Sequence, residues 1–147
     1  MGVSKIESIP LLNVSEVVAI IGTTPAAGVE ISETVPTGQV WEVVGVSFRL
    51  VTNAVVGNRV VDLIMDDGSV SLIESNSATN QVATRTRDYI CAAYGYNITT
   101  EAATIEIPLP SGIILPAGAR IRTETAALDA GDQYSNVRIL VRRSGAL

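Results

Sequence analysis

Apolar and polar residues alternate through most of this chain, and the clearest run lies within residues 35–52. After a turn marked by Pro36 and Gly38, apolar side chains recur at even positions: Val40, Val44, Val46, Phe48 and Leu50. Because side chains alternate across a strand, this even set should face a core, and the odd positions from Trp41 to Arg49 should face a wetter surface. The pattern predicts one long strand that is buried on one side.

Shorter runs of the same kind predict further strands along the whole chain. They fall at residues 17–21, 29–31, 55–65, 69–75, 81–94, 97–107, 111–115, 119–125 and 134–143. Strands that recur at roughly 8–12-residue spacing without an amphipathic helix are typical of a sandwich or barrel. We therefore expect an all-β fold, a jelly-roll-like antiparallel β-sandwich of about 8–10 strands with an extended N-terminal arm.

The chain start differs in pattern from the rest. Residues 1–16 show no sustained period, and Pro10 blocks a helix through their middle. Four aliphatic side chains make this segment too apolar for a free tail: Ile6, Ile9, Leu11 and Leu12. We expect residues 1–16 to be an extended arm that packs on a neighbouring subunit, and residues 17–147 to form a single β-sandwich domain. A disordered start is the alternative.

Trp41 is the second interface candidate. Its odd position in the long strand predicts that it lies outside the sandwich core. A large ring is rarely left bare on a sheet, so something should cover it. The arm, a loop such as 108–118, or a second subunit are the candidates.

The composition indicates that much apolar surface must be buried. Apolar residues are 47% of the 147 and charged residues only 17%, below the roughly 25% of soluble domains. No apolar run approaches the roughly 20 residues of a membrane helix, so no membrane partner is expected. The chain either buries surface in a partner or holds a large β core. A net charge of −5 argues against nucleic-acid binding.

Catalytic and metal-binding residues are scarce. The chain has no His, and Lys5, the only Lys, lies in the arm, so the common general bases are missing. Cys91 is the only Cys and falls within a predicted strand. Asp129, Asp132 and Asn136 could offer oxygen atoms to calcium, but their spacing does not match an EF-hand loop. We expect no enzyme activity and no cofactor.

Arginines form the remaining candidate set. Arg120 and Arg122 share one face of a predicted strand, and Arg138 and Arg142 share one face of the last strand. Two strands linked by one loop often pair, which would gather the four side chains into one patch. Such a patch suits an acidic partner or an inter-subunit contact. A solvated face with scattered ion pairs is the alternative.

Residues 35–69 and 109–141 resemble small tailed-bacteriophage virion accessory proteins of jelly-roll type, the capsid cement or decoration proteins. The resemblance rests on turns and strand starts: Pro36, Gly38 and Trp41; Asn58 and Arg59; Asp66 to Gly68; Leu115 to Ile121; and Ala130 to Tyr134. It implies a structural virion protein that binds and stabilises the capsid surface. Its partners would be further copies of itself, as a homotrimer, and the major capsid protein or another virion protein. Its location would be the virion, after assembly in the host cytoplasm.

A second class of function competes with this one. Jelly rolls also host sugar sites, and Tyr89, Tyr94 and Tyr96 cluster in sequence. A tail- or fibre-associated carbohydrate- or receptor-binding module is therefore the alternative.

Overall fold

The computed structural model describes residues 16–93 and 103–145, and these contain strands and loops but no helix. Their ten strands are β1 (Glu16–Ile21), β2 (Ser32–Thr34), β3 (Gln39–Val51), β4 (Val61–Asp66), β5 (Ser71–Asn76), β6 (Thr86–Ala92), β7 (Thr104–Pro108), β8 (Ile113–Leu115), β9 (Arg120–Thr125) and β10 (Gln133–Gly145).

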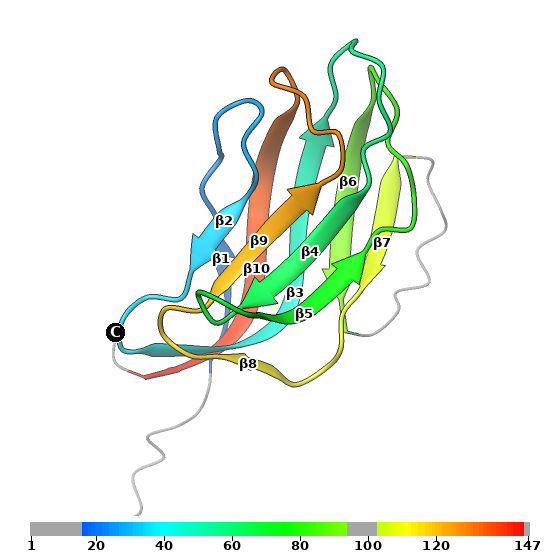
Figure 1. Ribbon diagram of the computed structural model, residues 1–147. Helices are drawn as coiled ribbons and strands as arrows, with labels where there is room; N and C mark the ends of the chain where they lie inside the picture. The colour runs from blue at the N-terminus through cyan, green and yellow to red at the C-terminus, as the bar shows by residue number, and fades with distance from the viewer. Residues whose placement is uncertain (1–15, 94–102, 146–147) are drawn as a thin grey trace, which may run out of the picture.

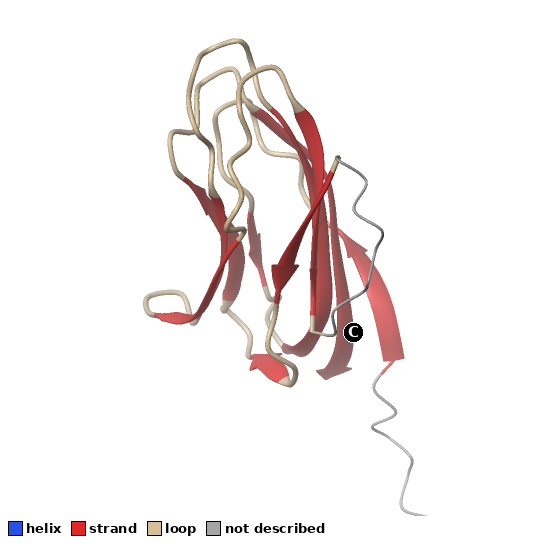
Figure 2. Cartoon of the chain, turned by 90° about the vertical axis from the view of Figure 1, so that its right-hand side faces the viewer, coloured by secondary structure: helices blue, strands red, loops and turns tan. Residues whose placement is uncertain are grey.

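The strands form two sheets that face each other (Figures 1 and 2). The larger sheet has the order β1-β10-β3-β6-β7, and β8 also pairs with β3. The smaller sheet has the order β2-β9-β4-β5. All pairs are antiparallel except β6 with β7, which run parallel. The predicted β-sandwich is confirmed, whereas its finer assignment as a jelly roll stays a prediction.

Some strands are shorter than the alternation predicts. The run at 55–65 becomes a strand only from Val61, and the run at 81–94 only from Thr86. Both omitted segments begin at one end of the sandwich, where Arg59 and Gln81 form an isolated β-bridge outside the named strands. Their side chains hold the loops together, so alternation there does not reflect sheet formation.

The core lies between the two sheets and takes alternate side chains from each. The smaller sheet contributes Val61, Leu63 and Met65 of β4, all with at most 1% exposure. The larger sheet contributes three aromatic rings, of which Phe48 stacks on Tyr89 and meets Tyr134 edge to face. Such offset and edge contacts add to the stabilisation from buried area.

Trp41 faces this core, contrary to the expectation from its odd position. It is 3% exposed and belongs to the buried cluster together with Val43, whereas Val40 is exposed. The reason is a β-bulge: Gly45 pairs with Leu140, and Val43 pairs with the next residue, Val141, so that Val44 has no partner. The extra residue reverses the alternation, because two residues then oppose one on the partner strand.

The chain itself covers Trp41. Strand β8 pairs with the start of β3 and places Leu115 beside Trp41. The indole Nε1 donates a hydrogen bond of 2.9 Å to the side-chain oxygen of Gln39. Residues 108–118, one of the three predicted covers, therefore supply a neighbouring strand to the tryptophan.

Candidate protein-docking site

A buried ion pair holds one end of the sandwich together. Arg59 Nε lies 2.8 Å from Asp132 Oδ2, and neither side chain has any exposed surface. A second bond of 3.2 Å joins Arg59 Nη2 to Asp132 Oδ1, so the contact is bidentate. The remaining guanidinium donors reach the carbonyl oxygens of Val55 and Gly57 and the side-chain oxygen of Asn53. A buried charge pair is stable only when its other donors and acceptors are satisfied, as they are here.

Three loops converge on the carboxylate side of this pair. Asp132 lies in the loop between β9 and β10 and accepts a 2.9 Å bond from the backbone N–H of Asn53, in the loop between β3 and β4. Its own carbonyl oxygen accepts a 2.7 Å bond from the N–H of Gly28, in the loop between β1 and β2. Burial alone would raise the pKa of Asp132, but the bonds from Arg59 and the backbone outweigh it and the pKa is lowered. The carboxylate therefore stays charged at neutral pH.

Gln81 attaches the fourth loop, which joins β5 to β6. Its buried amide donates 2.8 Å and 3.0 Å bonds to the carbonyl oxygens of Leu50 and Arg85. Its amide oxygen accepts a 2.9 Å bond from the Tyr89 hydroxyl, whose pKa burial raises. The four loops at the top of Figure 1 thus rest on one buried polar network.

This loop end presents apolar side chains to solvent. Val56 is 94% exposed, and Val29, Val55 and Val82 are each exposed by 44% or more. Loops normally carry polar residues at the surface, and function concentrates in loops that a rigid scaffold positions. Exposed apolar side chains on a fixed backbone are suited to binding another protein.

The predicted arginine patch does not form. Arg120 and Arg122 lie on β9 in the smaller sheet, whereas Arg138 and Arg142 lie on β10 in the larger sheet. Strands β9 and β10 are consecutive in the chain, but the loop between them crosses from one layer to the other. The two arginine pairs therefore occupy opposite outer faces.

Arg120 and Arg122 neutralise one carboxylate. Both guanidinium Nε atoms lie 2.8 Å from oxygens of Asp66, whose side chain is only 2% exposed. The hydrogen bond from Arg120 is the main cause that holds the pKa of Asp66 well below its usual range, with Arg122 and the Gly68 N–H adding to it. On the outer face of the smaller sheet, these two arginines are therefore occupied by a carboxylate of the same chain.

Arg138 and Arg142 do share the outer face of the larger sheet. Arg142 lies 3.7 Å from Glu42 in a half-exposed ion pair. Arg138 donates a hydrogen bond of 2.9 Å to the carbonyl oxygen of Val137. The other interface candidates lie outside the described residues: Ile6, Ile9, Leu11 and Leu12.

No group of three or more His, Cys, Asp or Glu side chains in residues 16–93 and 103–145 is arranged to hold a metal ion. Asp129 and Asp132, two of the considered calcium ligands, both accept hydrogen bonds within the loop network. Cys91 is buried, which raises the pKa of its thiol to about 12 and leaves it unreactive.

Sequence reasoning missed Arg59 and Asp132 as the centre of this end. They lie 73 residues apart in the chain, so no local spacing connects them. The only signal was the placement of an Arg among apolar residues after Gly57 and Asn58.

No family model, curated protein or solved structure matches this chain. Within the described ranges, no helix has the length and apolar character to cross a membrane.

Proposed function

We propose that this chain is a structural virion protein, a capsid cement or decoration protein that docks through its loop end. The observation that carries the proposal is the apolar loop end on a buried ion-pair network, with Val56 almost fully exposed and Arg59 fully buried. The motif resemblance to small phage virion proteins supplies the class of partner, the major capsid protein or another virion protein.

The loop end fits a binding role because its backbone is already ordered. Association costs free energy for ordering side chains and loops, and a preformed surface reduces that cost. Arg59 and Asp132 fix the loops without exposing their own charges, because both side chains are fully buried.

The binding test uses a matched pair of substitutions on the full-length protein. Val56→Asp puts a charge into the loop end, whereas Val70→Asp puts the same charge into the exposed β4–β5 turn. Particles of the encoding phage that lack this protein should bind the wild type and Val70→Asp in a co-sedimentation assay, and should bind Val56→Asp at least about tenfold more weakly.

The two parts of the proposal fail in different ways. Equal binding of Val56→Asp and wild type would rule out docking through the loop end. Absence of the protein from purified virions by mass spectrometry, together with no binding of the wild type, would rule out the virion function itself.

As part of this proposal, the protein assembles as a homotrimer on the capsid surface. The trimer number comes from the resemblance, and the support for self-association is the apolar composition, with exposed Val17, Ile21 and Ile114 on strands. Light scattering at micromolar concentration should give about three times the mass of the 15.4 kDa chain. A monomer across that concentration range would contradict it.

The second candidate is a carbohydrate-binding module. A hollow of about 370 Å³ on the larger sheet is lined partly by polar side chains, including Ser47, Asp88, Thr104 and Asn136. Sugar sites usually add a stacking ring, but Trp41 and the rings of Phe48, Tyr89 and Tyr134 are buried. A reproducible hit on a glycan array that Asn136→Ala removes would favour this candidate.

A further inference from the structure

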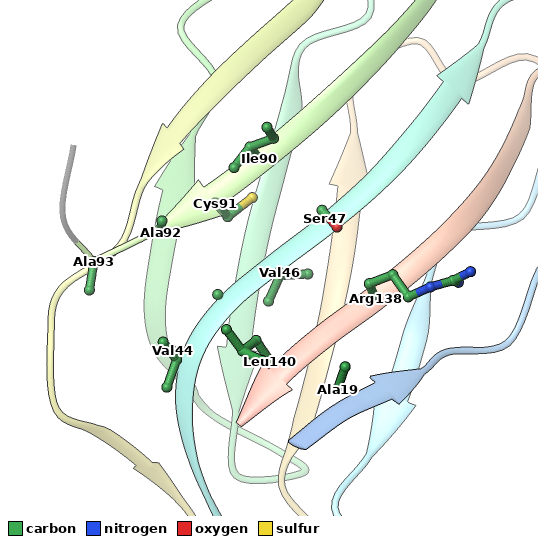
Figure 3. Close-up of a pocket in the computed structure, with 11 residues that line it drawn as sticks. Ala19, Val44, Val46, Ser47, Ile90, Cys91, Ala92, Ala93, Arg138 and Leu140 are labelled. Carbon is green, nitrogen blue, oxygen red and sulfur yellow. The ribbon is translucent and has the colours of Figure 1, made fainter. Parts of the chain in front are cut away.

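The outer face of the larger sheet contains an apolar groove. It has a volume of about 530 Å³ and is lined by side chains from four strands, shown in Figure 3: Ala19 of β1, Arg138 and Leu140 of β10, Val44 and Ser47 of β3, and Ala92 of β6. Most of its wall is carbon, and Arg138 supplies the one cationic side chain of the lining.

Strand register explains why the sheet is hollow here. Ala19 pairs with Leu140, Leu140 pairs with Gly45, and Gly45 pairs with Ala92. Three of the four residues in this row carry one side-chain carbon or none. Side chains stand roughly perpendicular to a sheet, so a row of small residues leaves a trough across it.

Arg138 lies at the border of the groove, and no ion pair involving it is found in the described residues. Within residues 16–93 and 103–145, no carboxylate lies within ion-pair distance of its guanidinium, which donates a hydrogen bond to the Val137 carbonyl oxygen. Nearby Asp88 already pairs with Arg49 at 2.8 Å. Ile21, which pairs with Arg138, is 74% exposed. This face therefore suits an apolar segment that carries one negative charge.

We infer that residues 6–12 of the same chain occupy this groove. Their sequence, IESIPLL, joins four aliphatic side chains to one carboxylate, Glu7. Pro10 favours an extended path, which an apolar peptide needs in order to lie along a shallow trough. The composition of the segment and the groove therefore match in both apolar character and charge.

The position of β1 supports the same chain as the source. The arm joins β1 at Glu16, only three residues before Ala19 in the groove wall. Residues 6–12 therefore lie close along the chain to β1, the strand that forms one wall of the groove. Arg138 pairs with Ile21, the last residue of this strand, so the cation expected to attract Glu7 lies on the strand next to β1. This inference does not depend on the proposed function.

Lys5 allows a direct test, because it is the only lysine of the chain and a lysine-specific protease should cut there alone. Leu140→Glu places a charge in the groove, and Leu72→Glu makes the same change at an exposed position on β5 in the other sheet. Leu140→Glu should speed cleavage after Lys5 by about tenfold, and Leu72→Glu should leave it unchanged, since cleavage follows the population of the undocked segment. Equal rates in all three proteins would overturn the inference.

Cysteine pairs identify which copy supplies the segment. Ile9→Cys combined with Leu140→Cys should form an intramolecular disulfide on mild oxidation, whereas Ile9→Cys with Leu72→Cys should not. Cys91 does not interfere because it has no exposed surface. A disulfide-linked dimer would assign the groove to the arm of a neighbouring copy and overturn the inference, and so would the absence of any disulfide in the first pair.

Discussion

At the scale of single residues, the buried charges in this protein each meet a full set of partners. Arg59 and Asp132 have no exposed side-chain surface, and every buried side-chain polar atom in the described residues has a hydrogen-bond partner. Removing one member of such a pair leaves the other charged in a dry environment, which costs more than the pair contributes as a whole.

Arg59→Met should therefore lower the free energy of unfolding by about 3–5 kcal/mol. The matched control is Arg49→Met, which breaks the ion pair with Asp88 where both side chains are more than 40% exposed. The control should cost at most about 1 kcal/mol, because water solvates the released carboxylate. Denaturant melts of both variants measure the difference, and similar losses would show that Arg59 has no special structural role.

Trp41→Ala should lower the free energy of unfolding by about 3–5 kcal/mol, as for other buried aromatic residues. Trp41→Phe should cost less, since it keeps most of the ring volume. The loss should be the same at two protein concentrations because the chain itself covers the indole. Tryptophan emission typical of a fully hydrated indole in the intact protein would contradict this burial.

At the scale of elements, the β-bulge in β3 decides which side chains reach the core. Alternation places Val46, Phe48 and Leu50 correctly, and all three are buried. It fails before Gly45, where one extra residue reverses the phase and turns Trp41 inward. A bulge depends on pairing with β10, far along the chain, so the local pattern of β3 cannot reveal it. Gly45 was the only local sign, because glycine inside a strand often marks a bulge.

The β4–β9 pair provides a test through pH. Asp66 at the end of β4 accepts bonds from Arg120 and Arg122, and folding lowers its pKa below the usual carboxyl range. A lowered pKa in the folded state means that the ionised group stabilises the fold above the ordinary carboxyl pKa. That contribution is lost as pH falls through the lowered pKa.

Asp66→Asn should thus reduce the free energy of unfolding at pH 7 by about 1–3 kcal/mol. The difference from wild type should shrink as pH falls below about 4, where the unfolded-state carboxyl becomes protonated. Glu74→Gln, which removes an exposed carboxylate on β5, should change stability by no more than about 0.5 kcal/mol. A difference that stays constant down to pH 2 would show that Asp66 acts by packing rather than by charge.

At the scale of the whole molecule, the sandwich was predictable and the loop end was not. Alternation, turn residues and the lack of helical periodicity predict two β layers because each strand carries its own signal. The sequence of a strand does not indicate which of the two sheets the strand joins. Consecutive β9 and β10 were expected to pair, yet they lie in different sheets and separate Arg120 from Arg138. The loop end arises from contacts between residues such as Asn53, Arg59 and Asp132, which only the folded topology brings together.

Removal of residues 1–13 tests whether the β domain folds without its N-terminal arm. The buried core cluster lies entirely between Ile31 and Val141, and β1 keeps its pairing with β10. The truncated protein should therefore keep its β-type circular dichroism and a cooperative melt, with a loss of no more than about 3 kcal/mol for the apolar surface it no longer covers. It should also bind more of an apolar dye than the full chain, because the groove around Leu140 is then open. A truncated protein that does not fold would place the arm in the core and contradict the boundary between arm and domain.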